Sequence, residues 1–193
     1  MDIYYPVILF IIFAVLCIPG GKYLSMVISY EENPFDRVFA PIDNFIYKIL
    51  NVKKDNMNWK EYGSVILYSN FFAFLITFLV FKFQGLFQSG NTDFGLALSF
   101  NSAVSFVTNT NLQNYGGEDA SLVTTLVIIF MMFFSAATGF AAASAFIRGL
   151  AKAKGLGNFF MDVTRIITRV LLPLAVIVSL FLIINNVPQT FSG

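Results

Sequence analysis

Residues 95–117 read GLALSFNSAVSFVTNTNLQNYGG, and this stretch decides the fold. Residues 95–107 are mostly apolar with interleaved serine and asparagine; as a helix they would be about 20 Å long at about 1.5 Å per residue. A bilayer core of about 30 Å needs about 20 apolar residues, so this helix is too short to cross it. Thr92 or Asp93 is expected to cap its N-terminus. Residues 108–117 are rich in residue types that adopt turns and left-handed backbone, which predicts a polar, extended loop.

The short helix lies between segments that are long enough to cross a membrane. Over half of the chain is hydrophobic (57%), and only 12% is charged, which is about half the usual share. The N-terminal run has Asp2 and no basic residue ahead of it, so we interpret it as a retained helix rather than a signal peptide. We therefore predict an all-α membrane protein with one re-entrant pore helix and filter loop, and with four transmembrane helices over residues 3–28, 62–81, 121–147 and 166–187.

Basic residues are distributed unevenly between the connecting segments. Residues 30–61 and 148–165 contain Lys and Arg, whereas residues 83–120 contain neither. The positive-inside rule therefore places loops 30–61 and 148–165 in the cytoplasm and the N-terminus and the middle loop outside a plasma membrane. Arg169, near the start of the fourth span, is expected to extend its side chain to the interface.

Several functions are disfavoured by what the sequence lacks. There is no histidine, and the single cysteine, Cys17, cannot form an internal disulfide. No phosphate-binding loop of the G-x-x-x-x-G-K-[ST] type is present, so the chain is not expected to be an enzyme in itself. A net charge of +1 gives no reason to expect a nucleic-acid partner.

The polar loop favours ion binding. Irregular backbone at membrane depth is tolerated only where it is buried in protein or lines a wet cavity. The negative end of the short helix would face a cation, and backbone carbonyls can replace its hydration shell. A cation site at Val107, Thr108, Asn109, Thr110 and Asn111, with no other metal, is therefore one interpretation of this loop.

The same residues also fit interpretations that involve no ion binding. A polar external loop beside an amphipathic surface helix would have a similar composition. Gln113 is a candidate for the rim of the filter, although an exposed loop glutamine is almost as good an interpretation. The small residues of the third span (Ala136, Ala137, Gly139, Ala141, Ala142 and Ala143) are expected to pack against other helices rather than contact ions.

Residues 101–118 (NSAVSFVTNTNLQNYGGE) resemble the first pore segment of the KdpA family, the potassium-translocating subunits of Kdp P-type ATPases. Residues 57–62 (MNWKEY), 134–139 (FSAATG), 146–148 (FIR) and 162–165 (DVTR) resemble further stretches of the family in the right order. The resemblance implies a backbone-carbonyl K⁺ filter at Val107–Asn111, with K⁺ as the transported ion and no other cofactor. It also implies a catalytic P-type ATPase subunit and small accessory membrane subunits as partners, beside membrane lipid.

The resemblance also implies a domain plan. Residues 1–29 would be an extra N-terminal helix, 62–147 the first span-pore-span repeat with its pore helix at about 95–107 and its filter at 107–111, and 166–193 the first helix of a second repeat. The chain stops at Gly193 before a second pore segment, so we expect it to be an N-terminal fragment or truncated product that cannot conduct alone. A stand-alone potassium channel subunit and a non-transporting scaffold remain alternatives.

Overall fold

The computed structural model describes residues 4–87 and 93–187, and all regular structure in this part of the chain is helical. Within these described residues, four helices are long and apolar enough to cross a membrane, as predicted. Residues 159–184 form one such helix, made of α6, the π-helix η3 and α7. The elements are α1 (Tyr4–Ile28), α2 (Asp36–Ile49), α3 (Trp59–Lys82), η1 (Gln84–Leu86), α4 (Leu96–Val107), η2 (Gly117–Asp119), α5 (Leu122–Leu150), α6 (Phe159–Ile166), η3 (Ile167–Leu171) and α7 (Leu172–Ile184).

Two of the expected boundaries differ in the structure. The predicted loop 148–165 is only residues 151–158, because α5 continues to Leu150 and α6 begins at Phe159. Asp93 does not cap α4: the N-cap is Gly95, without a side-chain bond, and the Asp93 carboxylate accepts the Gly85 N–H at 2.8 Å instead. Thr92 and residues 188–193 lie outside the described residues.

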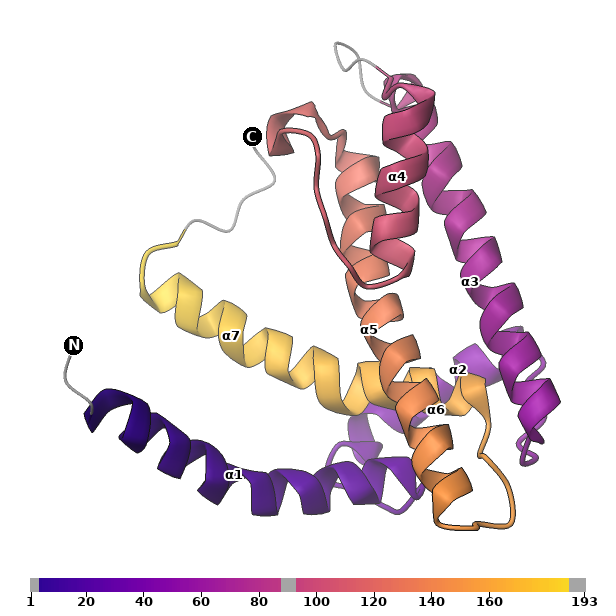
Figure 1. Ribbon diagram of the computed structural model, residues 1–193, viewed down its shortest axis with the longest axis vertical. Helices are drawn as coiled ribbons and strands as arrows, with labels where there is room; N and C mark the ends of the chain where they lie inside the picture. The colour runs from indigo at the N-terminus through magenta and orange to yellow at the C-terminus, as the bar shows by residue number, and fades with distance from the viewer. Residues whose placement is uncertain (1–3, 88–92, 188–193) are drawn as a thin grey trace.

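Helices α3, α4 and α5 form the main bundle (Figure 1). Its apolar centre contains Phe81 of α3, which is fully buried and meets the rings of Phe94, Phe106 and Tyr115 edge-on at centroid distances of 6.1, 6.1 and 6.3 Å. Edge-to-face aromatic pairs add to the free energy gained from burial. This cluster fixes α4 against the two long helices and so sets the position at which α4 ends.

A second apolar cluster joins α5 to α6. Ala137, Ala141 and Ala145 are buried along one face of α5, together with Tyr62, Phe159, Val163 and Ile166. Small side chains let helix backbones approach closely. The expected packing role is therefore confirmed for Ala137 and Ala141, whereas Gly139, Ala142 and Ala143 are exposed.

Helices α1 and α7 lean away from the main bundle, and α1 joins it only near its C-terminal end (Figure 1). The contact between α1 and η3 depends on Pro173. Proline has no N–H, so Pro173 cannot donate to the carbonyl of Arg169, four residues before it. The hydroxyl of Tyr23 in α1 donates to that carbonyl at 2.6 Å. The chain widens into the π-helix η3 at this point, so the proline both distorts the helix and provides a docking point for α1.

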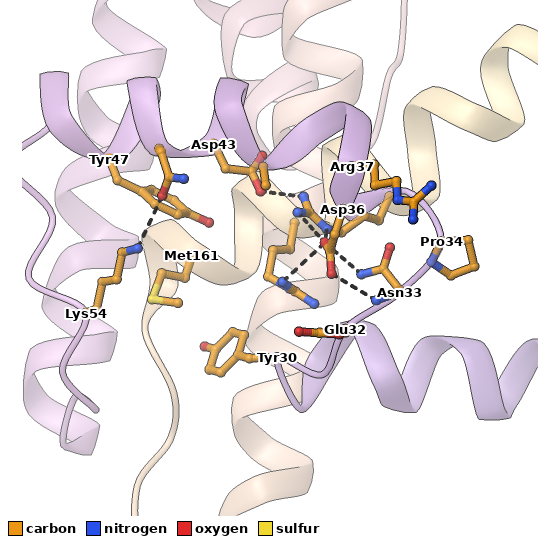
Figure 2. Close-up of a pocket in the computed structure, with 14 residues that line it drawn as sticks. Tyr30, Glu32, Asn33, Pro34, Asp36, Arg37, Asp43, Tyr47, Lys54 and Met161 are labelled. Carbon is orange, nitrogen blue, oxygen red and sulfur yellow. Dashed lines mark hydrogen bonds and ion pairs between the residues drawn. The ribbon is translucent and has the colours of Figure 1, made fainter.

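Helix α2 is an amphipathic helix that the sequence analysis left within a loop. Figure 2 shows Asp36 and Asp43 on α2. Both form ion pairs with Arg169 of η3. The guanidinium of Arg169 is 2.6 Å from Asp36 and 2.5 Å from Asp43, and the Arg169 side chain is 2% exposed. The expectation that Arg169 extends to the interface is therefore wrong, because two carboxylates distant in sequence hold it inside the protein.

Candidate functional site: the re-entrant loop

The loop begins where α4 ends against the middle of α5 and then returns to the end from which α4 started (Figure 1). Ser135, which lies 13 residues after the start of α5 at Leu122, donates its hydroxyl to the Asn109 side chain at 3.3 Å. The return is fixed at Gln84, just after α3, which donates to the Asp119 carbonyl at 3.0 Å. The chain therefore enters the bundle, reverses at residues 108–111 and leaves on the same side.

One residue of α4 receives the amides of the reversing chain. The carbonyl of Ser105 accepts the N–H groups of Thr110 at 2.9 Å and Asn111 at 3.1 Å. The hydroxyl of Ser105 accepts the N–H of Leu112 at 2.6 Å. Asn109 and Asn111 adopt left-handed backbone, with φ of 58° and 54°, which asparagine tolerates better than most residues. Amides in such alternating backbone converge on one point, and here that point is Ser105.

The carbonyl groups of the loop consequently face the other way. In a planar trans peptide, the C=O of one residue points opposite to the N–H of the next. Since the amides of Thr110, Asn111 and Leu112 point at Ser105, the carbonyls of Asn109, Thr110 and Asn111 point away from it. Thr108 to Asn111 are all exposed. The loop therefore presents a row of carbonyl oxygens on an open face.

The side chains of the loop brace one another. The hydroxyl of Thr108 donates to the Val104 carbonyl at 2.9 Å and lies 2.9 Å from that of Thr110. The Asn111 amide donates to Asn109 at 3.2 Å. These contacts hold the loop in shape without a charged group. Neutral oxygen ligands suit a monovalent cation better than a divalent one, and the described residues include no cluster of His, Cys, Asp and Glu that could hold a metal.

Val107 is the last residue of α4, and Thr108, Asn109, Thr110 and Asn111 form the turn that follows it. Gln113 is exposed beyond the Leu112 amide, so it lies next to this group rather than in it. Ser105 and Ser135 contact the loop from behind, although the sequence analysis gave neither a role in the site. Serines in largely apolar helices were the available signal, but pattern alone does not tell a packing serine from one that holds a loop.

Gln84 is another residue that the sequence analysis missed. It is fully buried, and its Oε1 atom accepts the Ser121 N–H at 3.1 Å and the Thr124 hydroxyl at 2.9 Å. Ser121 is also the N-cap of α5, where its hydroxyl accepts the Thr124 N–H at 3.1 Å. Gln84 therefore connects the end of α3 to the start of α5, where the loop ends.

Replacing Gln84 by leucine is expected to lower the free energy of unfolding by about 1–3 kcal/mol, because it leaves the Ser121 N–H and the Asp119 carbonyl without this partner. The measurement is the apparent Tm of the detergent-solubilised protein. Gln113→Leu makes the same change at an exposed position and is the matched control. Equal Tm values for the two variants would contradict the bracing role of Gln84.

The fold and the loop together define a class of membrane protein in which a re-entrant helix and an extended carbonyl-lined segment lie between two spans. Residues 7–193 match the family described as "KdpA: Potassium-transporting ATPase A subunit". The chain therefore belongs to the KdpA family, which confirms the resemblance seen in the sequence.

Three curated relatives share one name. Proteins named "Potassium-transporting ATPase potassium-binding subunit" match from Clostridium acetobutylicum (44% identity, 100% of this chain, 36% of the relative) and Caldanaerobacter subterraneus subsp. tengcongensis (40% identity, 94% and 34%). A third, from Clostridium botulinum, is 40% identical over 94% of this chain and 33% of its own length. The chain thus spans about a third of the length of the curated relatives it matches.

Proposed function

We propose that Val107–Asn111 is one strand of a potassium filter in the membrane subunit of an ATP-driven potassium uptake pump. The observation that carries this proposal is the convergence of the amides of Thr110, Asn111 and Leu112 on Ser105. It turns the carbonyls of the loop to the open face, where they can replace the hydration shell of K⁺. The names of the relatives, which describe potassium-binding subunits of potassium-transporting ATPases, support the same ion.

The proposed orientation follows from the basic residues. Loop 50–58 contains Lys53 and Lys54, loop 151–158 contains Lys152 and Lys154, and α2 adds Arg37 and Lys48. Cytoplasmic loops are enriched in such residues. In this orientation the loop opens to the outside, K⁺ enters from there, and Gln113 lies at the rim of the filter.

Energy for uptake has to come from another chain. The sequence has no phosphate-binding loop. We therefore propose a catalytic P-type ATPase subunit as partner, together with small accessory membrane subunits. In the proposed domain plan, α1 precedes the first span-pore-span repeat, residues 62–147 form that repeat, and residues from 166 onward begin a second one.

Replacing Thr110 by phenylalanine is expected to weaken the apparent affinity for K⁺ at least tenfold. The ring replaces a hydroxyl that is 2.9 Å from Thr108 and obstructs the carbonyl row. A tenfold change corresponds to about 1.4 kcal/mol, a modest effect for obstructing one strand of an ion site. The measurement is K⁺-stimulated ATPase activity and Rb⁺ uptake by the assembled pump, each as a function of ion concentration.

Asn114→Phe is the matched control for this experiment. It adds the same bulk to an exposed position of the same loop, three residues after the last filter carbonyl. We expect it to leave the apparent K⁺ affinity unchanged. A Thr110→Phe pump with the affinity and selectivity of the unmodified one would rule out Val107–Asn111 as the ion site. Uptake without any ATPase subunit would favour a channel.

A further inference from the structure

We propose that Ser105 is a positioning residue that determines how well the loop discriminates between cations, an inference that rests on the proposed function. Ser105 does not belong to the proposed filter, Val107–Asn111. It lies behind these residues, 6% exposed, in the last turn of α4. From there it holds the loop at three consecutive amides, two through its carbonyl and one through its hydroxyl.

The hydroxyl is the part of this arrangement that depends on the residue type. Any residue at position 105 would supply the carbonyl that accepts from Thr110 and Asn111. Only a hydroxyl side chain offers an oxygen to the Leu112 N–H, and the distance of 2.6 Å is short for a hydrogen bond from an amide. The bond fixes the peptide plane between Asn111 and Leu112. Because that plane also contains the Asn111 carbonyl, the Ser105 hydroxyl sets the direction of the last carbonyl of the row.

Ion discrimination is sensitive to this direction. Selectivity among monovalent cations depends on the size of the site and on the number and field strength of the carbonyls around the ion. Without the hydroxyl, the Asn111–Leu112 plane can rotate, so the outermost carbonyl no longer holds a fixed distance from the ion. Two further contacts, between Asn109 and Ser135 and between Asn109 and Asn111, would still brace the inner part of the loop. The expected defect is therefore partial and confined to ion recognition.

The test is Ser105→Ala in the assembled potassium-transporting ATPase. We expect the apparent KM for K⁺ to rise about tenfold and the preference for K⁺ over Na⁺ to fall by a similar factor. The maximal ATPase rate at saturating K⁺ is expected to stay within about twofold, because the change removes no group that touches the ion. A serine with a purely structural role would lower the amount of folded pump, or its maximal rate, without changing the preference between ions.

Ser102 provides a matched control in the same helix. It is fully buried, and its hydroxyl has no hydrogen-bond partner within the described part of the chain. Ser102→Ala therefore removes the same oxygen from α4, one turn earlier, without releasing an amide of the loop. We expect its K⁺ affinity and its K⁺ over Na⁺ preference to match the unmodified pump.

A second pair of variants protects the test against misfolding. Threonine and valine have nearly the same shape, but only threonine has a hydroxyl. If Ser105→Ala does not assemble, Ser105→Thr is expected to keep a K⁺ over Na⁺ preference that Ser105→Val loses. Equal preferences in the two would overturn the proposal.

The failure of this inference can be told from a failure of the proposed function. If Thr110→Phe weakens K⁺ binding and Ser105→Ala leaves affinity and preference unchanged, the filter stands and the role of Ser105 is wrong. If neither variant changes them, the loop is not the ion site and both proposals are wrong.

Discussion

Replacing Asp162 by asparagine is expected to cost about 3–5 kcal/mol of folding free energy, because it leaves a largely buried arginine without its counter-ion. Asp162 lies in the first turn of α6 and is 3% exposed. Its two oxygens accept from the Arg148 guanidinium at 2.7 and 2.8 Å. The hydroxyls of Tyr30 and Tyr62 donate to the same carboxylate at 2.7 and 2.8 Å. An asparagine side chain would keep one acceptor oxygen, but its NH₂ group would face groups that are themselves hydrogen-bond donors.

The loss would affect several elements because Arg148 connects them. Its guanidinium also donates to the carbonyls of Ile28, at the end of α1, and Leu156, in the loop before α6. Tyr62 adds α3 through its bond to Asp162. Asp162 therefore holds together the ends of α1, α3, α5 and α6. Because α5 also carries Ser135, a disturbed junction is expected to reduce the amount of correctly folded loop as well.

The measurement for Asp162→Asn is the apparent Tm and the fraction of monodisperse protein after solubilisation. Asp55→Asn is the matched control, since Asp55 is an exposed carboxylate in the loop between α2 and α3. We expect a Tm lower by several degrees for Asp162→Asn and no change for Asp55→Asn. An Asp162→Asn protein with the Tm of the unmodified one would show that this junction contributes little to stability.

The long helices were predicted well from local sequence, because a membrane span depends mainly on the length of an apolar segment. The prediction of residues 62–81 found most of α3 (Trp59–Lys82), and residues 95–107 nearly matched α4. Each of these elements is set by its own composition. The same holds for the reversal of the chain, where Asn109 and Asn111 adopt the left-handed backbone that their residue type suggested.

Contacts between distant residues could not be predicted in this way. Arg169 was expected at the interface, but Asp36 and Asp43 meet it from more than 120 positions away in the sequence. Helix α2 did leave a signal: Val38, Ile42, Phe45 and Ile49 recur at helical spacing and form its exposed apolar face. That signal was obscured because a basic segment between two spans is ordinarily interpreted as a loop.

The residues of the candidate site also differ in whether local sequence could predict them. The residues that offer carbonyls were predictable, because an uncharged polar stretch after a helix too short to span a membrane is unusual. The residues that hold those carbonyls in place were not, since Ser105, Ser135 and Gln84 act through hydrogen bonds that only the folded chain creates. In this loop the choice of the proposed ion ligands is local, whereas their orientation depends on tertiary structure.

The second large effect is expected from Arg169→Met, which would leave Asp36 and Asp43 without their shared counter-ion. The side chains of Arg169 and Asp43 are 2% and 5% exposed, so removing the arginine leaves a buried carboxylate uncompensated, at a cost of about 3–5 kcal/mol. Arg37→Met is the matched control, because Arg37 is exposed and directed away from the ion-pair cluster (Figure 2). We expect a large fall in Tm for Arg169→Met and little change for Arg37→Met.

The two aspartates are not expected to contribute equally. Burial raises the pKa of Asp43 by more than the charge of Arg169 lowers it. Burial also acts to raise the pKa of Asp36, but the Asn33 N–H and the Arg169 guanidinium outweigh it and hold that pKa below its usual value. Asp36 therefore stabilises the fold as an anion, whereas ionised Asp43 opposes it. We expect Asp36→Asn to lower the Tm more than Asp43→Asn.

The pH dependence of Arg169→Met follows from the same carboxylates. Without the arginine, the pKa of Asp43 is expected to rise further, because the positive charge that lowered it is gone. A group whose pKa is raised on folding favours the folded state at low pH, and this contribution is lost as pH rises through the folded pKa. Asp36 acts with the opposite sign in the unmodified protein, which loses stability as pH falls through its lowered pKa. The Tm difference between Arg169→Met and the unmodified protein should therefore be smaller at about pH 5 than at about pH 8, and a gap that widens on acidification would contradict the assignment of Arg169 as the counter-ion of this pair.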